Sequence, residues 1–179
     1  MRHTVKREIF DAVYIQEPMK IFVLLLLVPA LAGSAHPPLK PVHWAIVGGS
    51  APHTVIAGKP SEVVLAADIA EGWYIYSLTQ KPGGPFPLRI QLANAADVGL
   101  LGPIKAPKPF TKFDPNFGIE TELHRGKPRF TLPLGVPARS RTGRRELTIT
   151  ARYQACSETL CLPPRTEKIP LKLSIKRGP

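Results

Sequence analysis

The sequence predicts an all-β fold, an antiparallel sandwich of short strands, and three observations lead to it. The 179 residues include 21 prolines and 14 glycines, and proline stops helices because its nitrogen has no hydrogen to donate. No long stretch repeats apolar residues at the period of about 3.6 that an amphipathic helix needs. Short segments between the breaks alternate apolar and polar residues instead, which is typical of strands with one face in a core and the other in water.

The two clearest strands lie near the C-terminus. Residues 146–155 alternate in this way, and residues 166–176 place aliphatic side chains on one face and lysines on the other. Shorter β-type segments precede them, each bounded by turn-forming residues. The predicted strands are His43–Val47, Glu62–Ile69, Trp73–Leu78, Leu88–Ala93, Ile119–His124, Arg129–Leu134, Glu146–Ala155 and Thr166–Lys176.

An unbroken apolar run, Ile21–Leu31, lies near the N-terminus. It is shorter than the ~20 residues that a membrane-spanning helix needs. Lys20 precedes the run and small residues follow it, which is typical of a secretory signal peptide. We expect residues 1–35 to be this peptide, cleaved after Ala35 or, as the alternative, after Ala32. A buried core helix is the other interpretation of the run.

The segment ahead of the apolar run contains three acidic residues, which do not suit a signal peptide. We therefore expect translation to start at Met19. Residues 36–179 form one exported domain in this interpretation, because no composition shift or linker divides them. Both cysteines of the chain lie far beyond the run, so none is placed to carry a lipid anchor.

The chain is strongly basic, with a formal net charge of +11 at pH 7. Such a charge attracts nucleic acid, anionic lipid or an acidic protein. We expect no nucleic-acid partner, because an exported protein seldom meets one. Much of the excess charge lies in Arg139–Arg145. This segment is interpreted either as a solvated hairpin tip or as a docking patch for an acidic partner or a membrane surface.

The strongest chemical signal is a pair of cysteines, Cys156 and Cys161, the chain's only two. Four residues separate them, and they lie between the last two predicted strands, where a tight turn would place the sulfurs side by side. As a structural staple the pair would close a ring of only six residues. Loop-closure entropy makes such a ring worth roughly 2 kcal/mol, against ~3 kcal/mol for fifteen residues. A redox-active pair and a structural disulfide both remain open on spacing alone.

A metal site is the third interpretation of the pair, since two cysteines supply half of a tetrahedral zinc site. The four histidines of residues 36–179 show no ligand-like spacing to them. We therefore expect no metal and no other cofactor.

The residues around the cysteines resemble a known family. Tyr-Gln-Ala-Cys at 153–156 and Cys-Leu-Pro-Pro at 161–164 resemble the N-terminal periplasmic domain of the thiol:disulfide interchange protein DsbD. Gly72–Ser77 is similar to that family's Gly-aromatic-x-x-Tyr strand, and Phe113–Gly118 to its aromatic cap loop. The resemblance covers roughly residues 42–175.

The resemblance implies an immunoglobulin-like sandwich with a redox-active pair of cysteines in the periplasm. Cys161 is the cysteine expected to form a mixed disulfide, and Cys156 the one that resolves it. The electron donor would be a thioredoxin-like domain or a membrane reductant, supplied separately because this sequence contains neither. The acceptors would be oxidised periplasmic proteins. A non-catalytic immunoglobulin-like binding module with a structural disulfide is the alternative function.

Aromatic residues are the other candidates for the site. A lid would protect a dithiol from the wrong oxidant, and Phe113 or Phe117 is the candidate that the resemblance implies. The alternative for both is an ordinary place in the core. Tyr74 and Tyr76 are expected to line the site, or else to divide between the core and a hydrogen-bond partner.

Glu158 lies between the two cysteines. A carboxylate at this place disfavours a nearby thiolate and raises the cysteine pKa. The loop itself contains no lysine or histidine to offset it. We therefore expect cysteines that react well only when a partner docks.

Overall fold

The computed structural model describes residues 40–178, with gaps at residue 94, residue 96 and residues 115–116. The expected signal peptide, with both candidate cleavage sites and the candidate start at Met19, lies outside the described residues. Every element in the described part is a β-strand, so the all-β prediction is confirmed. No helix there could cross a membrane.

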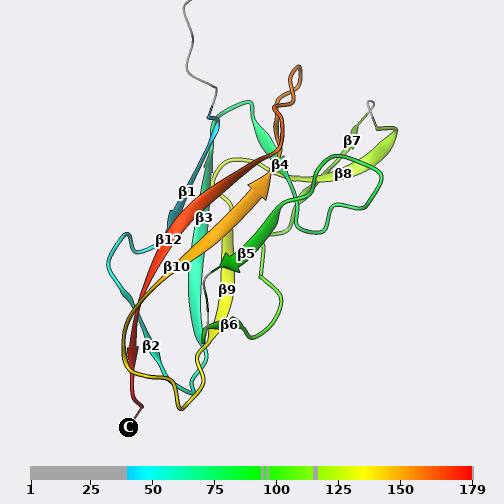
Figure 1. The fold of residues 1–179 in the computed structure, drawn as a ribbon. Coiled ribbons are helices and arrows are strands. Elements are labelled where there is room, and N and C mark those ends of the chain that lie inside the picture. The colour runs from blue at the N-terminus through cyan, green and yellow to red at the C-terminus, as the bar shows by residue number, and fades with distance from the viewer. Residues whose placement is uncertain (1–39, 94, 96, 115–116, 179) are drawn as a thin grey trace, which may run out of the picture. The chain divides into compact units, whose positions relative to one another are not determined.

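Two four-stranded sheets form an immunoglobulin-like sandwich. Figure 1 shows β10 and β12 in the near layer with β3 and β9 behind them. All pairs in the two sheets are antiparallel except β2 with β12, which is parallel. The first sheet has the order β1 (Val42–Ile46), β3 (Ser61–Ile69), β9 (Arg129–Gly135) and β6 (Gly99–Leu100). The second has the order β2 (His53–Ile56), β12 (Arg165–Lys176), β10 (Gly143–Tyr153) and β5 (Arg89–Ala93).

The main core lies between these sheets and follows from the alternation in the sequence. Leu147 of β10 is opposite Leu171 of β12, and Ile149 is opposite Ile169; all four side chains are buried. Alternate residues of β3 and β9 are buried in the same way. Fully burying one such aliphatic side chain contributes ~1.5–3 kcal/mol. The described residues of this core all lie between Val42 and Ile175, within the compact unit Pro38–Pro179.

A third, smaller sheet carries the cysteine region. Its order is β11 (Ala155–Cys156), β4 (Tyr74–Tyr76), β8 (Ile119–His124) and β7 (Phe110–Asp114). The chain enters β11 directly after β10 ends, and Figure 1 shows β7 and β8 projecting to one side at this end of the sandwich. All three residues of β4 are buried. Ile75 belongs to the main core, whereas the two tyrosines form a second cluster with Leu123 and Cys156.

All eight predicted strands are present, with ends that shift by up to three residues, and β11 forms the end of the predicted segment 146–155. Three strands were not predicted: β2, β6 and β7. The first two have four and two residues, too few for a period of two to stand out. β7 overlaps the expected cap loop, because Phe113 and Asp114 end this strand, and the described turn residues before β8 are Phe117 and Gly118.

Candidate redox site

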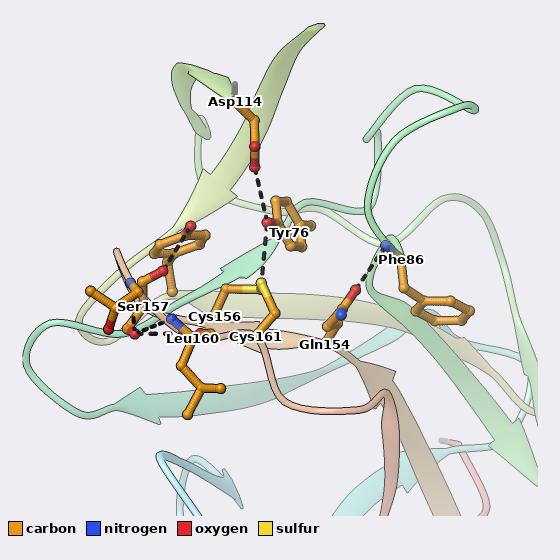
Figure 2. Close-up of a disulfide and its surroundings, with 10 residues drawn as sticks. Tyr76, Phe86, Asp114, Gln154, Cys156, Ser157, Leu160 and Cys161 are labelled. Carbon is orange, nitrogen blue, oxygen red and sulfur yellow. Dashed lines mark hydrogen bonds between the residues drawn. A yellow bond between two sulfur atoms is a disulfide. The ribbon is translucent and has the colours of Figure 1, made fainter. Parts of the chain in front are cut away.

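Cys156 and Cys161 are joined by a disulfide bond. Cys156 lies on β11, where it pairs with Tyr74 of β4, and Cys161 returns opposite it across a tight loop. Two backbone hydrogen bonds close the loop: the amide of Ser157 donates to the carbonyl of Leu160 at 2.7 Å, and the amide of Leu162 donates to the carbonyl of Ala155 at 2.9 Å. Figure 2 shows the disulfide between Cys156 and Cys161, at the two ends of this loop.

The two cysteines differ sharply in exposure. Cys156 is fully buried, with 0% of its surface exposed, whereas Cys161 is exposed. An open depression of about 580 Å³ lies beside Cys161. Its lining includes Tyr74, Lys112, Asp114 and Phe117. A thiolate from another protein can therefore approach Cys161, and the surrounding protein covers Cys156.

Tyr76 connects the buried sulfur to a carboxylate. Its hydroxyl lies 3.5 Å from Sγ of Cys156 and 3.5 Å from Oδ2 of Asp114, and it can donate its single hydrogen to either. Figure 2 shows the hydroxyl between these two groups. Burial, followed by the neighbouring Tyr74 and Asp114, raises the pKa of Tyr76 far above its usual value. Tyr76 therefore stays a neutral hydrogen-bond donor at physiological pH.

Tyr74 and Tyr76 lie on the same face of β4, two residues apart, with their rings edge-to-face and their centroids 5.7 Å apart. The hydroxyl of Tyr74 donates to the carbonyl of Ser157 at 3.3 Å. Both tyrosines thus contact the cysteine loop, and neither belongs to the main core. A role for the two tyrosines in redox chemistry stays a prediction.

Two cations from outside the loop hold Glu158. Nζ of Lys112 lies 2.5 Å from one carboxylate oxygen, and Nη2 of Arg125 lies 3.3 Å from the other. Both cations also lie over the ring of Tyr74, at 5.7 and 5.5 Å from its centroid. The hydrogen bond and charge of Lys112, with a smaller effect of Arg125, lower the pKa of Glu158. Lys112 of β7 and Arg125, directly after β8, thus supply the charges that the loop itself lacks. That the cysteines react well only when a partner docks stays a prediction.

The two candidate lid residues occupy different places. Phe117 is 42% exposed and lines the depression beside Cys161. Phe113 is 59% exposed and is not part of that lining. Successive residues of a strand point to opposite faces, so Phe113 faces away from the side that Lys112 and Asp114 present to the depression. The interpretation of both phenylalanines as core residues is wrong.

Further polar contacts fix the neighbouring loop and were not predicted. The side-chain oxygen of Gln154 accepts a hydrogen bond from the amide of Phe86 at 3.3 Å. On the other side, the side-chain oxygen of Gln80 accepts from the amide of Glu122 at 2.7 Å. The carboxylate of Glu122 accepts from Ser77 at 2.8 Å and from Thr79. Bonds from these hydroxyls lower the pKa of Glu122.

These contacts and those of Tyr76 and Glu158 join residues about 30 to 80 positions apart, so local sequence patterns do not reveal them. Asp114 had one sequence signal, its place in the segment that resembles the cap loop. In the described part of the chain, no three His, Cys, Asp or Glu side chains come together as a metal site would require.

A comparison with protein families identifies the family of this chain. The family model described as "Thiol:disulfide interchange protein DsbD, N-terminal" matches residues 47–173, well over half of the chain. No curated protein matches the sequence. Among solved structures, the DsbD N-terminal domain of Neisseria meningitidis in the reduced form is 22% identical, with a TM-score of 0.45. That match covers 66% of this chain and 82% of the other.

The N-terminal periplasmic domain of ScsB from Proteus mirabilis is 17% identical, with a TM-score of 0.46. This match covers 74% of the present chain and only 45% of the ScsB chain. The major pilin subunit BcpA of Bacillus cereus, in a D312A variant, is 12% identical with a TM-score of 0.44, over 76% of this chain and 40% of that one. On the family match and the disulfide at its motif, the chain belongs to the family of the N-terminal domain of the thiol:disulfide interchange protein DsbD.

Proposed function

We propose that this protein is a periplasmic thiol–disulfide exchange module that relays electrons to other exported proteins. The observation that carries the proposal is the contrast between the exposed Cys161 and the fully buried Cys156 within one disulfide. A relay needs one sulfur that partners can reach and a second, protected sulfur that completes the exchange. The location rests on the family's periplasmic domain and on the expected signal peptide.

In the first half of the relay, a donor reduces the module. A thiolate of the donor attacks Sγ of Cys161, the Cys156–Cys161 bond breaks, and Cys156 leaves as a thiolate. The donor is then held to Cys161 by a mixed disulfide. A second thiolate of the donor attacks the donor's sulfur in this mixed disulfide. A disulfide forms within the donor, and Cys161 leaves as a thiolate. Two electrons have moved, the donor is oxidised, and the module holds a dithiol.

In the second half, the dithiol reduces an acceptor. The thiolate of Cys161 attacks a disulfide of an oxidised exported protein, and one sulfur of that protein leaves as a thiolate. Cys156 then attacks Sγ of Cys161, which re-forms the original disulfide and releases the acceptor's second sulfur. We propose a thioredoxin-like domain or a membrane reductant as the donor, and oxidised periplasmic proteins as acceptors.

Tyr76 supports both halves because its hydroxyl faces Cys156. A hydrogen bond to a charged acceptor is roughly twice as strong as one between neutral groups. The bond from Tyr76 therefore gains strength when Cys156 becomes a thiolate, and this favours Cys156 as the leaving group. Asp114 accepts the same hydrogen in the alternative contact at 3.5 Å, so it can hold the hydroxyl near the sulfur in the oxidised state.

Phe117 is the proposed shield of the pair, because it lines the depression beside Cys161 and is exposed enough to move without disturbing the core. A partner would displace this side chain on docking. Lys112 and Glu158 line the same depression, and Arg125 pairs with Glu158, so a partner that approaches Cys161 meets charged groups beside it.

The reduction potential tests the proposal against a purely structural disulfide. Equilibration of the protein with a dithiol redox buffer is expected to give a potential less negative than about −300 mV, the range below which structural disulfides of secreted proteins lie. The fold should survive reduction, because the six-residue ring contributes only roughly 2 kcal/mol. A potential well below −300 mV would support the alternative, a binding module with a structural disulfide.

The order of attack has a separate test. With Cys156→Ser, the exposed Cys161 should form a stable mixed disulfide with a thioredoxin-like protein that keeps a single active-site cysteine, activated beforehand as a mixed disulfide with thionitrobenzoate. Thionitrobenzoate leaves as a thiolate, and neither protein then has a second sulfur to resolve the bond. With Cys161→Ser, the buried Cys156 should form little or none. Equal trapping by the two variants would contradict the assigned roles.

A further inference from the structure

One face of the sandwich carries a dense and unpaired set of cations. Alternate residues of the second sheet, β2–β12–β10–β5, are buried in the core, and the residues between them point outward. Among the outward residues of these four strands the only carboxylate is Glu146, which lies opposite Lys172. The outward cations are Arg89, Arg144, Arg152, Lys168, Lys172 and Lys176.

The six cations of this basic face take no part in the ion pairs found among the described residues. Arg152 lies over the ring of Phe86, with its guanidinium carbon 4.4 Å from the centroid. It is also directly opposite Arg89 in the strand register. Like charges on one face repel each other. Most of the carboxylates that could offset this repulsion lie on other parts of the molecule. The face therefore attracts an anionic partner.

The shape of the basic face indicates which anionic partner fits. Lys168, Lys172 and Lys176 recur at every fourth residue of one strand, so they point the same way at intervals of about 13 Å. The exposed large apolar residues of the described chain all lie outside the four strands of this sheet. A specific protein interface is built around buried aromatic or apolar anchors, and this face has none. Cations distributed over a whole sheet are electrostatically complementary to a surface whose negative charge is also distributed over a wide area.

We propose that this basic face binds the surface of an anionic lipid bilayer. Each lysine or arginine near such a surface contributes about 1 kcal/mol, equivalent to about a five-fold change in affinity. The loop with Cys161 projects from the end of the sheet beyond β10 (Figure 1). A domain lying on this face would thus keep the exposed sulfur within reach of soluble proteins. The proposal is independent of the redox function.

The test uses residues 38–179, the compact unit that contains the main core, and so leaves out the apolar run at 21–31. Binding is measured by co-sedimentation with vesicles of phosphatidylglycerol and phosphatidylcholine, and with vesicles of phosphatidylcholine alone. We expect binding to the anionic vesicles only, and its loss at about 0.5 M salt, where screening is strong. Vesicle binding that is unchanged by salt, or equal for both lipid compositions, would overturn the proposal.

A matched pair of triple variants locates the contact. Lys168→Gln, Lys172→Gln and Lys176→Gln together should weaken binding to the anionic vesicles by about 100-fold. Lys105→Gln, Lys108→Gln and Lys127→Gln remove the same charge from exposed positions outside the sheet and should weaken it only slightly. Thermal melts of all three proteins check that each is folded. Equal losses in the two triples, or no binding of the parent to anionic vesicles at low salt, would show that the face is not a membrane contact.

Discussion

The hydroxyl of Tyr76 lies 3.5 Å from Sγ of Cys156, the sulfur of the disulfide that solvent does not reach. Tyr76 is itself fully buried, so this hydrogen bond forms away from water. In such a low-dielectric environment a hydrogen bond is electrostatically stronger than in water. The predictions below begin with this contact and move outward.

Replacing Tyr76 with phenylalanine should slow the reduction of the disulfide. Tyr76→Phe removes the donor that stabilises Cys156 as a leaving thiolate. A hydrogen bond worth about 1–1.5 kcal/mol corresponds to a rate lower by a factor of about 5–13. The rate is measured by mixing the oxidised protein with dithiothreitol. Tyr153→Phe is the matched control, because Tyr153 is equally buried but belongs to the main core. Equal slowing in both variants would mean that the effect is not local to the sulfur.

Glu158→Gln should lower the pKa of the Cys161 thiol. The substitution leaves Lys112 and Arg125 without their carboxylate partner, and unpaired cations favour a nearby thiolate. The fall in pKa is expected to be modest, because these charged side chains are partly exposed and water screens them. Alkylation rates against pH report it, with Cys156→Ser as the background so that only Cys161 reacts. Glu120→Gln is the control: it removes one negative charge as well, but from a residue outside these ion pairs. It should leave the pKa of Cys161 unchanged. A higher pKa in Glu158→Gln would refute the compensation by the two cations.

Phe117→Ala should speed the oxidation of the reduced protein by a small disulfide such as oxidised glutathione. The side chain lines the depression beside Cys161, so its removal opens the approach to the sulfur. Phe113→Ala is the control, because Phe113 is also exposed but does not line the depression. Both changes at exposed positions should alter stability by less than about 0.5 kcal/mol. If Phe113→Ala speeds oxidation as much, Phe117 has no special shielding role.

His124 should make the domain less stable in mild acid. The side chain is 2% exposed, and burial lowers its pKa below the usual value of about 6.5. As the pH falls below 6.5, the unfolded chain binds a proton that the folded one resists, so stability present above this pH is lost progressively. The loss is at most about 1.4 kcal/mol per pH unit from this group.

Urea unfolding at pH 7 and pH 5 measures this loss. His124→Phe should flatten the dependence, because a phenylalanine side chain does not titrate, whereas His43→Gln at an exposed position should not. An unchanged pH dependence in His124→Phe would exclude His124 as its source.

The sequence allowed the sandwich to be predicted because its strands alternate strictly. The aliphatic residues of β10 and β12 lie at every second position, and such a pattern has one stable solution, a half-buried sheet. β7 was not predicted, because the prolines before Phe110 and the aromatic motif after it resemble a loop. The pairing of Glu158 with Lys112 was missed for a related reason. It depends on β7 and β8 lying beside the cysteine loop, and that arrangement is tertiary.

The site itself was predictable only in part. The cysteine pair, Tyr74 and Tyr76 carry motif signals, and the structure brings all four together. Asp114 carries only the weaker signal of its place in the segment that resembles the cap loop, and Arg125, directly after β8, carries none. A single sequence reveals which residue types are present, and the contact of Tyr76 with Asp114 across 38 positions is visible only in the fold.

The strand β4 divides the domain into two environments, because Ile75 faces the main core while its two neighbours face the disulfide. We therefore expect reduction of the disulfide to change the packing on the tyrosine side of β4 and to leave the main core unchanged. A partner that discriminates between the reduced and the oxidised protein would then have to contact the loop at Cys161 itself.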